Sequence, residues 1–474
     1  MKKLRVICWI MAAFWTFSCT SFAVSAVSED AITNGCLTLD AGTSLAGNEQ
    51  ILPTAAAAIL YAPQYDTMVY SWQPDVRMDP SGMNKLMTCL IALEQGNPDA
   101  LVSVTYNALS SVETGALTAG LKVGEVLSLR DLLYCMMVGS ANDAAAVIAE
   151  HIAGSQAAFV AQMNTRAAAL GCTNTYFVNA TGLSHEGQYT SARDLAKITV
   201  EAMQQELFTE LFSAKEYTVP ATDKSAERSM HTTNYMMSDL KIRDHLDTRI
   251  TGGKTGALST SDRSLISTAE KGGLQYLCIV MSAQSKLTAD GMSVVQFGNF
   301  EETKMLLNHG YTNYSERQLL MGGDTVMAQF LVTGGENDLA VAPGKSVTAL
   351  MPTDMSVTEI SYRAVEASGG ISAPVEAGDV VGAVELWYGS MCVAKSDLIA
   401  MHPVKQAGTS AQVMQPQANP SVIAAKKVLA TIGIVVVVLV MLLLLVMVAI
   451  RAFHIYRHSK KGGKSTAKPH KRRQ

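Results

Sequence analysis

Apolar and polar positions divide the first part of the chain into strands followed by helices. Alternating apolar runs predict strands at 57–61 and 67–72. Helical spacing of apolar residues predicts a series of helices over 82–94, 130–138, 142–152, 155–169 and 191–205. This order is typical of a sheet that is covered by helices.

The strand pattern returns in the middle of the chain. Apolar runs predict strands at 264–269 and 276–281, and a helix is predicted near 290–309. These segments complete the sheet, so the helices around Ser140 form an inserted lobe in a mixed α/β (α+β) fold. We expect a cleft between the sheet and this lobe.

A small β-rich domain is predicted over 316–400. Its short apolar runs are broken by glycine and proline, and they cover 325–332, 346–351, 380–386 and 392–396. Residues 401–427 have the polar, proline-containing composition of a flexible stalk. The composition, with 48% hydrophobic residues in 474, is sufficient for two cores, a large one over 27–312 and this smaller one.

The N-terminus has the three parts of an export signal. Basic residues at 2, 3 and 5 precede an apolar stretch over 6–17, and Val24-Ser25-Ala26 offers small residues for cleavage. We therefore predict a signal peptide over 1–26 and an exported mature chain.

A second long apolar run, 428–450, has 23 residues and no charge. At about 1.5 Å per residue it spans a hydrocarbon core of roughly 30 Å, so we predict a transmembrane helix. Residues 451–474 contain nine Lys and Arg and no acid, which predicts a basic cytoplasmic tail. The expected location is the cell membrane, with a single span and a large N-terminal part outside the cytoplasm.

Charge excludes one class of partner for the outer part. Of 37 basic residues, nine lie in the tail and three in the signal, which leaves 25 against 41 acidic residues. Nucleic acid is therefore not an expected partner.

The cysteines are scattered and no His-Glu-x-x-His occurs, so neither a metal site nor a cofactor is predicted.

Three polar clusters lie at predicted element boundaries. Lys85 follows Pro80-Ser81-Gly82 at a helix start, and Ser140 and Asn142 lie between two helices. The third cluster is Lys254-Thr255-Gly256-Ala257, which precedes a strand. A phosphate-binding loop ending at Lys254 is excluded, because it needs a glycine at position 248, where the chain has Thr248.

In this order, the clusters resemble those of low-molecular-mass penicillin-binding proteins of the D-alanyl-D-alanine carboxypeptidase family, peptidase family S11. The resemblance covers roughly residues 50–400 and extends to the segments 139–159, 177–183 and 187–195. It implies a penicillin-binding-protein and β-lactamase-like transpeptidase fold with a helical lobe, followed by a β-sandwich. The implied ligands are peptidoglycan stem peptides ending in D-Ala-D-Ala, and β-lactams.

Asn179-Ala180-Thr181 also fits a glycosylation pattern, but a turn shared with the family is preferred.

The resemblance also implies a role for each matching residue. Lys85 would deprotonate a nucleophile, and Ser140 would pass the proton to the leaving D-alanine. Asn142 would position the acyl chain, and Lys254 and Thr255 would bind the terminal carboxylate. The backbone N–H groups of position 82 and Ala257, next to Gly256, would form the oxyanion hole.

The chain departs from the family pattern at the nucleophile, because Gly82 stands where Ser-x-x-Lys has its serine. Ser81 is a possible substitute through a shifted helix start. Two classes of function remain: a serine-type carboxypeptidase, and a binding protein that recognises the same peptides without forming an acyl-enzyme. Position 82 favours the second.

Overall fold

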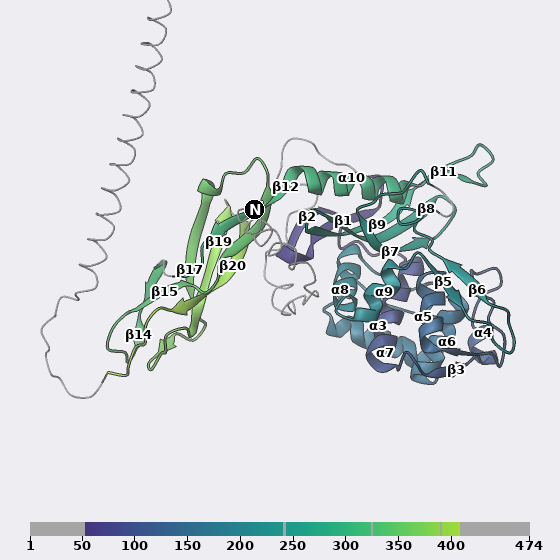
Figure 1. Cartoon of the computed structure of the whole chain (residues 1–474), viewed down its shortest axis with the longest axis horizontal. Helices are drawn as coiled ribbons and strands as arrows, with labels where there is room; N and C mark the ends of the chain where they lie inside the picture. The colour runs from purple at the N-terminus through teal and green to yellow at the C-terminus, as the bar shows by residue number, and fades with distance from the viewer. Residues whose placement is uncertain (1–52, 240–242, 324–325, 389–390, 408–474) are drawn as a thin grey trace, which may run out of the picture. The chain divides into compact units, whose positions relative to one another are not determined.

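The computed structural model describes residues 53–239, 243–323, 326–388 and 391–407 (Figure 1). The predicted signal peptide, transmembrane helix and basic tail, and most of the predicted stalk, lie outside the described residues.

A five-stranded antiparallel sheet forms the centre of the first domain. Its order is β2-β1-β9-β8-β7, so β7 is an edge strand. The strands are β1 (Ala57–Ala62), β2 (Thr67–Trp72), β7 (Ile250–Ala257), β8 (Asp262–Lys271) and β9 (Leu274–Gln284). The turn between β8 and β9 is Gly272-Gly273, both with positive φ, as a two-residue hairpin turn favours.

Both faces of the sheet are buried, and neighbouring residues along a strand enter different cores. Ile59 and Ile279 pack with the helical lobe, whereas Leu60 and Val280 pack on the other face with α10 (Gly298–Asn313). Figure 1 shows α10 on one side of the sheet and the lobe helices on the other. Burial on both faces explains the nearly continuous apolar sequence of β9.

The lobe consists of α-helices that mostly match the predicted ones. They are α3 (Lys85–Gln95), α4 (Tyr106–Ser110), α5 (Leu129–Met137), α6 (Asn142–Ala153), α7 (Gln156–Ala169), α8 (Ala192–Ala202) and α9 (Glu206–Ser213). Ser128 caps α5 in a capping box with Asp131, and Ser155 and Ser191 cap α7 and α8. These caps explain why the helix starts were predictable.

Two boundary predictions were wrong. The helix expected near 290–309 begins at Gly298, and the residues before it include β11 (Val294–Gln296), which pairs with β10 (Lys286–Leu287). A Cβ at Gly298 would lie 2.3 Å from the carbonyl oxygen of Gln284, so close packing on β9 sets this helix start. The helix expected over 191–205 ends at Ala202, and α9 follows as a separate helix.

Two pairs of short antiparallel strands were not predicted. They are β3 (Leu101–Ser103) with β4 (Val126–Ser128), and β5 (Glu216–Val219) with β6 (Arg228–His231). These strands have three or four residues each, too few for a periodic signal.

The second domain is all-β, as predicted. One sheet has the order β13-β15-β20-β19-β17, and β12 (Tyr314–Leu320) pairs with β16 (Val347–Pro352). The five strands are β13 (Ala328–Phe330), β15 (Leu339–Pro343), β17 (Ile360–Glu366), β19 (Val380–Tyr388) and β20 (Met391–Ala400). A separate core that includes Leu339, Val384 and Leu398 lies within this domain.

Within the described residues, no single helix has the length and apolar character needed to cross a membrane. Helices α6 and α7 satisfy both criteria only as a pair, with an 84° bend between them.

The described cysteines, at positions 89, 135, 172, 278 and 392, form no disulfide with one another.

Candidate functional site

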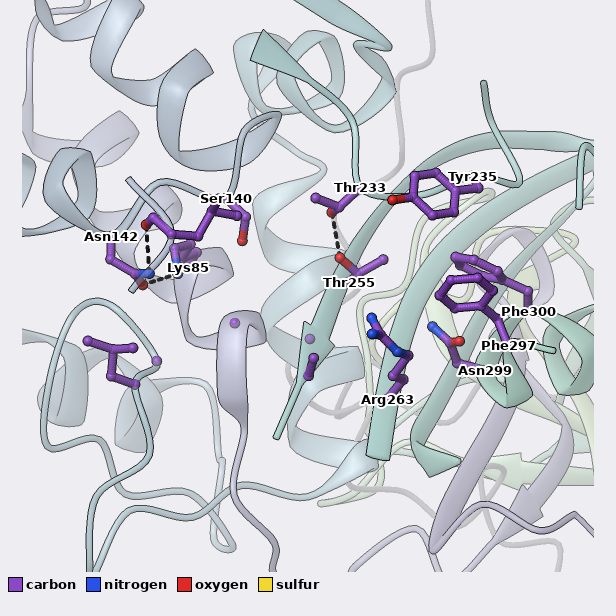
Figure 2. A pocket seen from close by; sticks show the side chains of 16 residues that line it. Lys85, Ser140, Asn142, Thr233, Tyr235, Thr255, Arg263, Phe297, Asn299 and Phe300 are labelled. Atoms are coloured by element: carbon purple, nitrogen blue, oxygen red, sulfur yellow. Dashed lines mark hydrogen bonds between the residues drawn. The ribbon is translucent and has the colours of Figure 1, made fainter. Parts of the chain in front are cut away.

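A pocket of about 330 Å³ lies where the lobe meets the edge strand β7 (Figure 2). Its size falls at the lower end of the range for small-molecule sites. The lobe contributes Lys85, Ser140 and Asn142, and β7 contributes Thr255, Gly256 and Ala257. The structure therefore brings the three sequence clusters together at one cavity.

Lys85 is the first residue of α3 and is buried. Its Nζ donates hydrogen bonds to Asn142 Oδ1, at 2.8 Å, and to the carbonyl oxygen of Thr181. Burial, reinforced by the nearby charge of Lys254, lowers the pKa of Lys85 well below its usual value, while Asp143 acts in the opposite direction. A lysine in this setting gives up its proton easily, as a general base must.

Gly82 lies in the short 3-10 turn Ser81–Asn84 (η2) directly before Lys85, and it lines the pocket. Its φ lies outside the left-handed region, so the backbone does not require glycine. A Cβ built at Gly82 would lie 3.7 Å from Ser140 Oγ and 3.1 Å from the carbonyl oxygen of Thr255. A side chain at position 82 would therefore enter the pocket beside Ser140.

Ser81 has a different environment from Gly82. It is 2% exposed, is not among the residues that line the pocket, and has a φ of 47°. A Cβ built at Gly256 would lie 2.1 Å from Ser81 Oγ, so this hydroxyl is directed against the backbone of β7. The Oγ is buried and has no hydrogen-bond partner in the described structure.

Ser140 and Asn142 lie in the connection from α5 to α6. Ser140 has a φ of 56°, an uncommon value for serine, which indicates a backbone held by its surroundings. The N-cap of α6 is Ala141, so neither polar residue is simply a helix cap. Asn142 Nδ2 donates to the carbonyl oxygen of Leu117 at 2.9 Å, which leaves its Oδ1 oriented toward Lys85.

Lys254 and Thr255 are neighbours on β7 and have different partners. Lys254 is buried, and its Nζ donates to Ser140 Oγ at 2.8 Å and to the carbonyl oxygen of Thr255 at 3.0 Å. Burial lowers the pKa of Lys254 to about 7. Thr255 lines the pocket, and its hydroxyl shares a hydrogen bond with that of Thr233 (Figure 2).

The wall opposite the lobe is aromatic and contains one cation. Tyr235, Phe297 and Phe300 pack edge to face or tilted against one another. Arg263, near the start of β8, has its guanidinium 5.1 Å from the centre of the Phe297 ring. Asn299 lies beside them, and Figure 2 shows Arg263 between Thr255 and this wall.

Comparison with known proteins identifies this arrangement. A family model described as D-alanyl-D-alanine carboxypeptidase matches residues 46–285, about half of the chain. The chain belongs to the D-alanyl-D-alanine carboxypeptidase family. A second model, described as the penicillin-binding protein 5 C-terminal domain, matches residues 314–406, so the expected family and its β-domain are confirmed.

Relatives within the carboxypeptidase family match different shares of this chain. The carboxypeptidase DacF of Bacillus subtilis (strain 168) is 27% identical over 75% of this chain and 87% of its own length. A carboxypeptidase of Streptomyces sp. (strain K15) is 31% identical over 56% of this chain and 96% of its own length. The crystal structure of penicillin-binding protein 5 from Haemophilus influenzae covers 76% of this chain and 100% of its own, with 25% identity and a TM-score of 0.61.

Several residues of this carboxypeptidase-family site were not assigned a role from the sequence. Thr233, Tyr235 and Arg263 lie in segments that carry no motif, and only the folded chain brings them to the pocket. The segment 177–183 was noted as part of the family resemblance, but not as a support for Lys85.

That support is a turn built by Asn179. Its Oδ1 accepts hydrogen bonds from the backbone N–H of Thr181 and Gly182, and its Nδ2 donates to the carbonyl oxygen of Leu183. The turn presents the Thr181 carbonyl oxygen to Lys85. The preferred interpretation of Asn179-Ala180-Thr181 as a turn is thus confirmed.

Proposed function

We propose that this protein is a membrane-anchored, extracytoplasmic protein that recognises peptidoglycan stem peptides ending in D-Ala-D-Ala in cell-wall biogenesis, and that it is catalytically impaired. Family membership supports the ligand class. One observation carries the proposed impairment: Gly82 stands at the position from which a side chain would enter the pocket beside Ser140.

The other groups that the reaction needs are present around this position. In a serine enzyme of this geometry, neutral Lys85 would take the hydroxyl proton, and Ser140 would pass a proton to the leaving amine. The serine oxygen would form an ester with the carbonyl carbon of the penultimate residue, and the terminal D-alanine would leave. Glycine supplies no oxygen, so this ester cannot form at position 82.

Recognition does not depend on the missing hydroxyl. Glycine retains its backbone N–H, and Gly82 and Ala257 both line the pocket, which supports the proposal that this chain retains both donors of the oxyanion hole. Asn142 and Thr255 also line the cavity and would contact the acyl part and the terminal carboxylate. A peptide would therefore bind without being cleaved.

The alternative is an active carboxypeptidase that uses Ser81 as a displaced nucleophile. Ser81 is 2% exposed, and its hydroxyl is directed at the backbone of Gly256. Bringing this oxygen to the place of a side chain on Gly82 requires a rearranged helix start, and an error of about 1 Å in position already costs roughly 100-fold in rate. The geometry therefore supports the binding protein over the enzyme.

Covalent labelling of the full-length protein with a fluorescent penicillin tests the proposal. We expect no label on the unmodified protein and stable label on Gly82→Ser. The backbone conformation at position 82 is allowed for serine. The carbonyl oxygen of Thr255 needs to shift by only a few tenths of an ångström to make room for the serine Cβ.

Ser81→Ala distinguishes the two functions. Labelling of the unmodified protein that disappears in Ser81→Ala would refute the proposed impairment and establish Ser81 as the nucleophile. Failure of Gly82→Ser to label, with its fold retained, would mean that more than the hydroxyl has been lost.

A further inference from the structure

Asn142 is held in place by the rim of the pocket. Its backbone N–H and its Nδ2 both donate to the carbonyl oxygen of Leu117, at 2.8 and 2.9 Å. Leu117 itself lines the pocket. Because Nδ2 is bound in this way, Oδ1 faces Lys85 Nζ at 2.8 Å (Figure 2). A displacement of Leu117 would therefore change the orientation of the Asn142 amide and the surroundings of Lys85.

Residues 117–121, the rim segment, are held by two charged side chains that do not line the pocket. Asp143 is 2% exposed and accepts hydrogen bonds from two backbone N–H groups of this segment, at 2.9 and 3.0 Å. Arg228 Nη1 donates to the carbonyl oxygens of Ala119 and Gly120, at 3.4 Å each. The donors and the acceptors of the rim segment are thus bound by different elements, α6 and β6.

Arg228 is held in turn by a carboxylate that solvent does not reach. Its guanidinium forms an ion pair with Glu125, whose side chain is 0% exposed against 12% for Arg228. The Glu125 carboxylate also accepts hydrogen bonds from Thr222 Oγ1 at 2.8 Å and from the backbone N–H of Lys122 at 3.0 Å. Removing one partner of such a pair leaves the other charge buried, so the two residues act as a unit.

The strand that carries Arg228 also supports Ser140. Arg228 and Met230 lie two residues apart on β6, so their side chains point to the same face of the strand. A Cβ built at Gly139 would lie 2.8 Å from Met230 Sδ, so Met230 packs directly on the backbone before Ser140. One face of β6 therefore contacts both the rim segment and the connection that contains Ser140.

We propose that Arg228, paired with Glu125, is a positioning residue that holds the rim segment and Asn142 in the arrangement that recognises the stem peptide. The inference rests on the proposed function, because it names what keeps that site in its binding geometry. Arg228 acts through the carbonyl oxygens of the rim segment and contacts no part of the ligand. Its loss should weaken binding although every side chain that lines the pocket is still present.

Isothermal titration calorimetry of the full-length protein with N-acylated L-Lys-D-Ala-D-Ala tests this inference. Arg228→Met keeps the apolar part of the side chain and removes the guanidinium. We expect it to bind the peptide roughly 10-fold more weakly, at a temperature at which circular dichroism shows the variant to be folded. Arg228→Lys retains a charge for Glu125 but has fewer donors, so it should recover part of the affinity.

Arg166→Met is the matched control. Arg166 also lies in the lobe, on α7, and forms ion pairs with Glu94 and Glu201, but none of these three residues lines the pocket. Its loss should lower the stability measured by denaturant unfolding. It should leave the affinity for the peptide unchanged.

Amide hydrogen exchange separates positioning from a general loss of stability. In Arg228→Met, the backbone N–H groups of Ala119 and Leu121 should exchange roughly 10-fold faster or more, because the segment that Asp143 and Arg228 hold together opens more often. Exchange within α7 should not change. In Arg166→Met, the rim segment should exchange as it does in the unmodified protein.

Each outcome decides for or against the role of Arg228. Unchanged affinity in Arg228→Met, a loss no larger than that of Arg166→Met, or weaker binding without faster exchange in the rim segment would overturn that role and leave the proposed function standing. If Arg228→Met does not fold, the same two measurements on Arg228→Lys decide, and both should change by a smaller factor. Absence of peptide binding by the unmodified protein would refute the proposed function and, with it, this inference.

Discussion

At the scale of single residues, the site is defined by two buried lysines that have little negative charge near them. Lys85 and Lys254 are each nearly inaccessible to solvent, and each donates hydrogen bonds to neutral oxygens. Keeping an ammonium group in such surroundings is costly, so both pKa values are lowered. Both unfavourable lysines lie at the site where an active family member would transfer protons.

The lowered pKa of Lys254 predicts a dependence of stability on pH. Its folded pKa is about 7 against an ordinary value of 10.5, so between these values the unfolded chain holds one more proton than the folded chain. The free energy of unfolding therefore rises with pH through this window. In Lys254→Met, the rise between pH 7.5 and 9.5 should be smaller by about 2–3 kcal/mol.

Urea unfolding of both proteins at the two pH values measures this difference. Lys122→Met is a suitable control, because the Nζ of Lys122 donates to an exposed carbonyl oxygen outside the pocket. An identical rise in Lys254→Met and in the unmodified protein would show that Lys254 titrates normally.

At the scale of elements, the turn over 179–183 holds the start of α3 in place. Gly182 has a φ of +77°, and a Cβ there would lie 1.9 Å from the carbonyl oxygen of Ser81. Asn84 Nδ2 also donates to the carbonyl oxygen of Asn179, at 3.0 Å. The position of Gly82 and Lys85 in the pocket therefore depends on a segment almost 100 residues further along the chain.

Two glycines in this region provide a matched test of that dependence. Gly187 also has a positive φ, of +86°, but a Cβ there would meet nothing within 4 Å. We expect Gly187→Ala to cost about 1–2 kcal/mol of backbone strain. Gly182→Ala should cost several kcal/mol more and should abolish peptide binding, because η2 must move away from the new methyl group.

Denaturant unfolding and peptide titration of the two variants measure these effects. Equal losses of stability in both would mean that only the backbone conformation matters at Gly182. Retained peptide binding in Gly182→Ala would show that η2 does not need this contact.

Elements with caps and periodicity were predictable, whereas elements defined by contacts were not. Helices α5, α7 and α8 start at serine caps that are visible in the sequence. The start of α10 was misplaced because Val294, Val295 and Phe297 extend its apolar spacing toward the N-terminus, although the chain there pairs as β11. Only the close approach of Gly298 to β9 determines the boundary.

At the scale of the whole molecule, the first domain, which contains the candidate site, and the all-β domain are followed by a segment that we propose to be a membrane anchor. The described residues from 53 to Ala407 belong to one compact unit. The anchor proposal rests on the uncharged run at 428–450 and the basic residues after it.

Membrane fractionation tests the anchor. We expect the full-length protein to sediment with membranes and to resist extraction with alkaline carbonate, whereas a chain ending at Ala407 should be recovered in the soluble exported fraction. A chain ending at Arg451 should remain membrane-bound, because the span is intact without the tail. Carbonate-resistant membrane association of the chain ending at Ala407 would contradict a C-terminal anchor.

The sequence alone determined the family, the two-domain order and the residues Lys85, Ser140, Asn142 and Lys254 of the candidate site, because helix caps, apolar periodicity and short polar motifs are local properties. It also identified Gly82 as the departure from the family pattern. The tertiary structure alone decided which groups meet: that Lys254 is bonded to Ser140, that Ser81 is directed at β7, and that Arg263 enters the pocket beside Thr255. These facts depend on the register of β7 with β8 and on the packing of the lobe against the sheet, which join residues far apart in the chain.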